Sequence, residues 1–199
     1  MNNFFLLNHN AQRVLLIIIL IFAFNCKKSE KEIYIEELKW SLEMPSEFKE
    51  VPIKNSEIAQ KNGIKLIESA YPEKKVIINA KSLFNYNNGR FNSIRAQLTE
   101  LNSEQTFENE FKRANEIVIK SIIKNRPKAE FEKKISRKTI DKLEFKTFNL
   151  KTLNKSGKNY EMKVFSKMFG MKKLDIIIVS DNKEKKKITE NIVLNSEFD

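Results

Sequence analysis

A short apolar segment followed closely by a single cysteine is the feature that most constrains this chain. Residues 14–24 read VLLIIILIFAF, and Cys26, the only cysteine in 199 residues, follows shortly after. Spanning a bilayer takes about 20 apolar residues, so this run is too short for a transmembrane helix. Its length suits the core of a secretory signal peptide, and Arg13 supplies the positive charge in front. The folded domain must therefore be built from the residues that follow.

The surroundings of Cys26 resemble the lipobox of bacterial lipoproteins, in which the signal is removed and lipid is attached to the cysteine thiol. Ala23 and Asn25 stand where that pattern usually has a leucine-like and a small residue. The resemblance implies a signal peptide over residues 1–25, lipidation at Cys26, and an anchor in a bacterial membrane, on the periplasmic face or the cell surface. The alternative is an uncleaved N-terminal anchor with an ordinary cysteine.

Removal of the signal also removes His9, the only histidine. A domain without histidine and with an acylated cysteine excludes Cys/His zinc sites and nucleophile systems of the Cys-His or Ser-His-Asp kind. One cysteine cannot form a disulfide framework. The sequence also contains no clustered aspartate loop for calcium and no glycine-rich phosphate loop. We therefore expect no cofactor and no metal.

Positive charge dominates the composition, with 37 Lys and Arg against 26 Asp and Glu and a net charge of +11. A basic surface can attract anionic lipid, polysaccharide or nucleic acid. Only six of the cations are arginines, whereas bidentate recognition of phosphate favours arginine over lysine. Glutamates are interspersed with the lysines almost everywhere, which is typical of a solvated surface. We therefore expect no nucleic-acid partner.

Hydrophobic periodicity predicts one α+β domain over residues 33–199, joined to the membrane by a charged tether over residues 26–32. The most apolar of the expected strands, residues 172–180, should lie centrally in the sheet. An Asn87-Asn88-Gly89 turn is expected within the domain. Period-two alternation and short apolar runs place the expected strands at 38–44, 64–70, 76–84, 94–98, 131–135, 143–153, 160–169 and 172–180.

Two helices are expected. Apolar residues recur at three- and four-residue spacing from Thr106 onward, and Arg126-Pro127 ends that helix. The second helix should begin at Asp181, with Glu184 completing a capping-box-like pair, and should present Ile188 and Ile192 on its inner face.

The predicted domain opens with the run 40–45 (WSLEMP) and Phe48, and it closes with a strand, turn, helix and tail over 174–198. These two ends resemble the opening strand and proline and the close of the PsbP-like family. The resemblance covers roughly residues 33–198 as a pattern of elements. It implies an α/β/α sandwich with a mainly antiparallel sheet covered by helices, in a fold that usually binds macromolecules. It carries over no binding residues.

Two functions of different classes follow from the sequence. The first is a non-catalytic binding or assembly module in the cell envelope, with an envelope protein or glycan as partner. The loop 84–91 combines aromatic and amide side chains with one arginine, which makes Tyr86 and Arg90 candidate contact residues. The alternative for this loop is a hairpin whose aromatics lie in the core. The second function is a hydrolase of envelope glycan or ester, which requires a facing carboxylate pair in a cleft.

Overall fold

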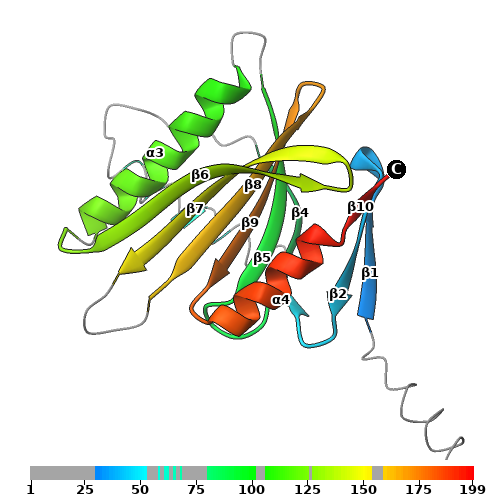
Figure 1. The fold of residues 1–199 in the computed structure, drawn as a ribbon, viewed down its shortest axis with the longest axis horizontal. Helices are drawn as coiled ribbons and strands as arrows, with labels where there is room; N and C mark the ends of the chain where they lie inside the picture. Colours follow the sequence, from blue (N-terminus) through cyan, green and yellow to red (C-terminus); the bar gives the residue numbers. More distant parts are fainter. Residues whose placement is uncertain are drawn as a thin grey trace, which may run out of the picture.

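The structure, a computed structural model, describes residues 30–52, 80–101, 106–125, 127–153 and 159–199, with isolated helical positions between 58 and 68. The predicted signal peptide and Cys26 lie outside the described residues. Two long helices and ten strands follow one another in the described part (Figure 1). In chain order they are β1 (Glu30–Ile35), β2 (Trp40–Pro45), β3 (Lys49–Glu50), β4 (Ala80–Asn87), β5 (Ser93–Glu100), α3 (Phe107–Asn125), β6 (Glu130–Ile140), β7 (Leu143–Leu153), β8 (Glu161–Phe169), β9 (Lys172–Ser180), α4 (Lys183–Leu194) and β10 (Glu197–Phe198).

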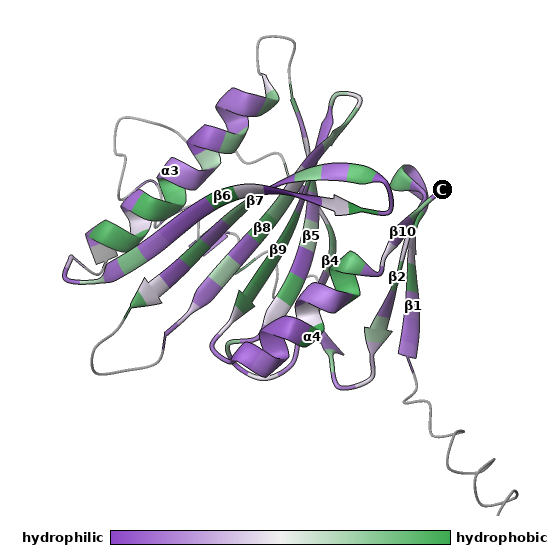
Figure 2. Ribbon diagram, in the orientation of Figure 1, coloured by the Kyte–Doolittle hydropathy of each residue, from purple (hydrophilic) through white to green (hydrophobic). Residues whose placement is uncertain are grey.

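The strands form two sheets in which every described pairing is antiparallel. The larger sheet has the order β3-β4-β5-β9-β8-β7-β6, and the smaller one has the order β1-β2-β10. Strand β9 is the fourth of seven, which confirms the prediction that residues 172–180 lie centrally. Figure 2 shows hydrophobic residues concentrated on this strand and hydrophilic residues along the edge strand β6.

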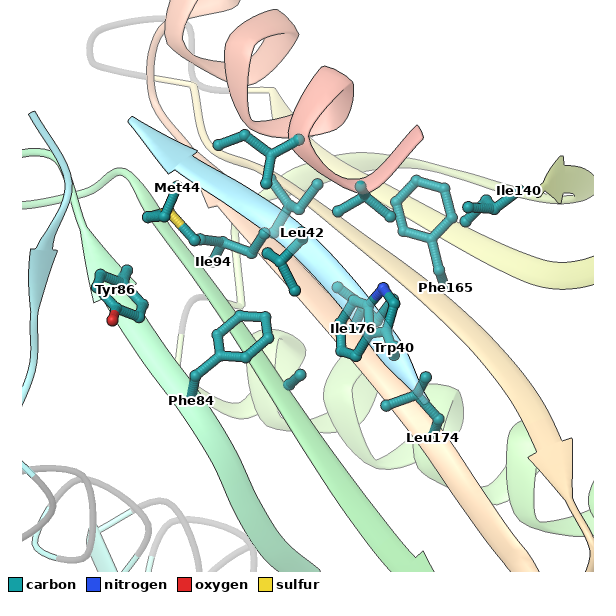
Figure 3. Close-up of a cluster of buried hydrophobic side chains, with 14 of the residues drawn as sticks. Trp40, Leu42, Met44, Phe84, Tyr86, Ile94, Ile140, Phe165, Leu174 and Ile176 are labelled. Carbon is teal, nitrogen blue, oxygen red and sulfur yellow. The ribbon is translucent and has the colours of Figure 1, made fainter. Parts of the chain in front are cut away.

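The main core lies between the seven-stranded sheet and a layer made of α4 and the small sheet. Trp40, Leu42 and Met44 alternate along β2 and point into this core, where Trp40 has no exposed surface (Figure 3). The Trp40 ring stacks on that of Phe198, with centroids 5.5 Å apart and planes 1° apart. Phe84 of β4 contacts the same indole at 5.5 Å. The Phe84 contact joins the small sheet to the large one, and aromatic pairs of this kind add to the free energy gained by burial.

The opposite face of the large sheet carries α3. Phe111 on the inner side of this helix packs against Phe148 and Leu150 of β7. The apolar residues of α3 recur at the three- and four-residue spacing expected from the sequence, and its bounds agree with the prediction. With α3 on one face and α4 with the small sheet on the other, the chain forms an α+β sandwich of the predicted class.

The N-terminus of α4 is tied to the turn after β4. Asn182 is the N-cap, and its side chain accepts hydrogen bonds from the backbone N–H groups of Glu184 and Lys185. The cap is therefore Asn182 and not the predicted pair of Asp181 and Glu184. Lys185 Nζ donates to the carbonyl oxygen of Asn88 at 3.0 Å, which anchors the β4–β5 turn.

Four other sequence predictions need correction. The strand expected at 64–70 is wrong, because the described positions Lys65 and Glu68 are helical. Ile64, Ile67 and Ala70 also recur every three residues, so the short run satisfied both periods.

Strand β1 begins at Glu30, so residues 30–32 belong to the sheet and not to the tether. Ile188 was expected on the inner face of α4, but it is 39% exposed. The buried residues of this helix are Thr189, Ile192 and Val193. The strand predicted at 76–84 is described only from Ala80, and it continues to Asn87. The differences at residues 30–32 and 76–84 shift the ends of strands, and the exposure of Ile188 leaves the layers unchanged.

Truncation of Trp40 should be among the most damaging changes in the main core. Because its indole is fully buried against Phe84 and Phe198, Trp40→Ala should lower the free energy of unfolding by about 3–5 kcal/mol. Tyr34→Ala in the same small sheet is the control, since Tyr34 is 54% exposed and its loss should cost less than about 0.5 kcal/mol. Urea unfolding followed by circular dichroism measures both. Equal losses in the two variants would contradict the described register.

A second prediction concerns the pH dependence of the contact between Glu37, in the connection from β1 to β2, and two lysines of the large sheet. Lys172 and Lys81 both donate to the carboxylate of Glu37, and these bonds lower the pKa of Glu37 to about 2. A carboxyl group whose folded-state pKa is depressed stabilises the fold above its unfolded pKa of about 4.5 and loses that contribution as the pH falls toward 2. Carboxyl-detected NMR titration should find this low pKa. Lys172→Gln should move it upward, and an unchanged value would show that the contact is absent in solution.

Candidate functional site

A polar cleft between α3 and the sheet is the best-built candidate site in the described part of the chain. It has a volume of about 220 Å³ and is lined by β5, β8, β9 and the inner flank of α3. Two of its residues, Lys173 and Asp175, are charged side chains in the central strand. Buried charges are rare unless they are paired, so their presence here calls for a specific arrangement.

Strand register explains how these side chains meet on the floor of the cleft. Side chains directly opposite each other in neighbouring strands point to the same face of a sheet. Asp175 is paired with Ser166 of β8 on one side and with Gln97 of β5 on the other. On one side of this row, Lys173 lies opposite Thr99. On the other side, Ile177 lies opposite Arg95 and Val164. Residues far apart in the sequence thus form a floor that combines polar side chains with the apolar Val164 and Ile177.

The buried charges on the floor compensate one another. Lys173 is 4% exposed and Asp175 is 6% exposed, and Lys173 Nζ lies 3.1 Å from Asp175 Oδ2. Ser166 Oγ donates a hydrogen bond of 2.6 Å to Asp175 Oδ1. Each oxygen of this carboxylate therefore has a partner, which offsets the cost of removing it from water.

The wall of the cleft formed by α3 also carries polar side chains. Arg113 donates to the buried Glu110 one turn earlier, with 2.7 Å between Nη2 and Oε2. Asn115 lies on the inner side of the same helix and is only 8% exposed. Its amide nitrogen has no hydrogen-bond partner within the described ranges. A buried donor without an acceptor costs about 1–3 kcal/mol, so this amide is suited to an acceptor supplied from outside.

Arg95 completes the cation set. Part of its long side chain is exposed, yet the walls of the cleft desolvate the guanidinium, which lowers the pKa of Arg95, and the carboxylate of Asp175 acts in the opposite direction. An arginine keeps its charge at neutral pH even after such a decrease. The cleft therefore holds three cations, Arg95, Arg113 and Lys173, against two carboxylates. Its lining has a net charge of one positive unit.

The structure separates the two contact residues predicted from the sequence. Tyr86 is buried in the main core at 4% exposure, and its hydroxyl accepts from Lys31 Nζ at 2.9 Å and donates to Glu50 at 3.2 Å. Arg90 is exposed on the turn, with its guanidinium 5.0 Å from the Phe91 ring centroid. The segment is a β-hairpin whose aromatic residues Phe84 and Tyr86 enter the core, as the alternative interpretation of this loop expected.

A larger groove of about 460 Å³ lies between the small sheet and α4. We regard it as a weaker candidate, because its charged residues are exposed and it combines no buried ion pair with an unpartnered donor. Its acidic lining consists of Glu30, Glu32, Glu43 and Glu197. No group of three or more metal-ligating side chains occurs within the described ranges. In the same part of the chain, no helix has the length and hydrophobicity needed to cross a bilayer.

Comparison with known proteins supports the fold. The chain is similar to the solution structure of cyanobacterial PsbP (CyanoP) from Synechocystis sp. PCC 6803, with a TM-score of 0.53, 8% identity, and coverage of 88% of this chain and 95% of that one. The fold is PsbP-like. The Ran-binding protein Mog1p of Saccharomyces cerevisiae also matches, at a TM-score of 0.43 and 13% identity over 84% of this chain and 86% of that one. No protein-family model and no curated protein matches the sequence.

The sequence contained two signals of the cleft that periodicity alone did not interpret. Lys173 and Asp175 are charged residues two positions apart in the most apolar strand, so both must point to one face. Asn115 interrupts the apolar side of a helix between Phe111 and Val118. Neither signal says that the two features share a cavity, because that depends on how α3 crosses the sheet.

The buried ion pair gives a direct test of the cleft floor. Lys173→Met leaves Asp175 without its cation and should lower the free energy of unfolding by about 3–5 kcal/mol. The double variant Lys173→Met, Asp175→Leu should recover most of that loss, because no buried charge remains. Lys151→Met in the exposed pair with Glu132 is the control and should cost less than about 1 kcal/mol. A double variant no more stable than Lys173→Met would argue against the pairing.

Proposed function

We propose that this protein is a cell-envelope lipoprotein, anchored to a bacterial membrane through lipid on Cys26, whose folded domain is a non-catalytic binding module. The observation that carries the binding role is the α3 cleft. It combines a net positive lining, a buried amide nitrogen that awaits an acceptor, and an apolar wall within one small cavity. Binding sites commonly join a mostly apolar lining to a few placed polar groups.

The contacts of the carboxylates in the cleft favour binding over hydrolysis. A two-carboxylate hydrolase uses one carboxyl as an acid and the other as a base or nucleophile. Here Glu110 is engaged by Arg113, and both oxygens of Asp175 are engaged by Lys173 and Ser166. Such pairing holds side chains in place for recognition. Turnover of an envelope glycan or ester by the pure protein would support the hydrolase alternative instead.

The anchor rests on the sequence around Cys26. The apolar core over residues 14–24 has the length of a signal peptide, and the first strand begins only four residues after Cys26. A tether this short would hold the domain against the membrane surface, where a component of the envelope is the expected partner. The Lys-rich surface would add only a weak attraction, because salt screens exposed charges over about 8 Å.

Lipidation at Cys26 is testable in cells. Growth with an alkyne fatty acid should label the protein, and Cys26→Ser should abolish the label because no other thiol is present. Click coupling to a fluorophore followed by gel electrophoresis measures both. Ser29→Ala, three residues further on, is the matched control and should keep the label. Equal labelling of the Cys26→Ser variant would exclude this anchor.

A further inference from the structure

The α3 cleft also indicates the chemical class of its ligand, an inference that rests on the proposed binding function. Its lining includes Arg95, Arg113 and the unpartnered amide nitrogen of Asn115. All three are hydrogen-bond donors, and two of them are cations. Arginine binds a carboxylate through two parallel hydrogen bonds, which makes it well suited to planar anions. These donors are therefore complementary to an anionic acceptor.

The charge balance limits the anion to a single negative charge. Glu110 and Asp175 lie in the same lining, and together with the three cations they leave one unit of positive charge. A phosphate monoester carries about 1.5 to 2 negative charges at neutral pH, which exceeds this excess. A carboxylate carries one charge and matches the excess.

Size and hydrophobicity limit the rest of the ligand. The same lining includes the apolar side chains of Phe111, Val118 and Ile177. Its volume of about 220 Å³ corresponds to roughly seven waters at liquid density. This is below the 300–1,000 Å³ typical of pockets for drug-sized molecules, so the ligand must be small. A body without polar groups fits these side chains, because apolar side chains leave hydroxyl groups unpaired.

We propose that the α3 cleft binds a small monocarboxylate with an apolar body, of the class of short-chain fatty acids. The carboxylate lies between Arg95 and Arg113 and accepts a hydrogen bond from the Asn115 amide. The hydrocarbon body packs on Phe111, Val118 and Ile177. Lys173 remains paired with Asp175 and contributes its charge to the lining.

The test uses the full chain in detergent micelles, with empty micelles as the blank, and hexanoate as the probe. Isothermal titration calorimetry should find hexanoate binding with a Kd of about 1 mM or tighter, as expected for a ligand of eight heavy atoms. Hexan-1-ol keeps the body and lacks the charge, and acetate keeps the charge and lacks the body. Both should bind at least about tenfold more weakly.

Variants of the cleft locate the binding. Arg95→Gln and Arg113→Gln should each weaken hexanoate binding by at least about tenfold and leave the weak affinity for hexan-1-ol unchanged. Two arginines allow the conclusion to stand if one substitution alters folding, which melting temperatures would reveal. Arg90→Gln, an exposed arginine outside the cleft, is the matched control and should bind as the wild type does. Equal hexanoate affinity in the wild type and in correctly folded Arg95 and Arg113 variants would overturn the proposal.

The same titration separates failure of the ligand class from failure of the binding function. Preferential binding of inorganic phosphate or a neutral sugar, lost in the Arg95 and Arg113 variants, would overturn the monocarboxylate while the binding module stands. Hydrolysis of methyl hexanoate, followed by release of methanol, would overturn the non-catalytic function itself and with it the inference that rests on it. Hexanoate binding without ester hydrolysis would support both.

Discussion

The alternation of side chains along the central strand β9 is the constraint on which both layers of this protein depend. Leu174, Ile176 and Ile178 point to the face beneath α4 and the small sheet, while Lys173 and Asp175 point to the α3 cleft. A register slip of one residue would exchange the two sets and place charges in the main core. Hydrogen-bonded neighbours on both sides, β5 and β8, hold the register. One strand therefore builds the hydrophobic core and the candidate site together.

The proposed binding function accounts for a buried ion pair on the cleft floor that stability alone does not require. Replacing a buried pair with apolar residues is often neutral or stabilising, so a pair such as Lys173 and Asp175 is weak support for a stabilising role. The many surface ion pairs of the chain contribute little individually for a different reason, because solvent and salt screen them. What distinguishes the cleft is the combination of paired charges with an unpartnered amide at Asn115. Polar groups held in place by their neighbours need little reordering when a ligand binds.

The two stretches that carried the family resemblance lie at opposite ends of the domain and are neighbours in space. Strand β10 pairs with β2, with Glu197 opposite Ser41 and Phe198 opposite Trp40, and the two rings stack. The backbone N–H of Phe198 donates to Asp141 in the β6–β7 turn, which connects this corner to the large sheet. Similarity to CyanoP at 8% identity shows that the overall fold persists with little shared sequence. A shared fold does not carry a function, so the binding role here is argued from the cleft.

The sequence by itself determined most of the architecture, because periodicity and breakers act locally. The alternation from Trp40 to Met44, the helix that ends before Pro127, and the apolar run over 172–180 all predicted elements that the structure confirms. Locally ambiguous runs failed, as at 64–70, where two periods fitted the same residues. The site was decided by tertiary structure. Tyr86 was a plausible surface residue until pairing placed it in the core, and Arg95, Asn115 and Asp175 meet only because α3 crosses strands that are distant in sequence. Contacts between distant segments depend on strand order and helix packing, which no local pattern encodes.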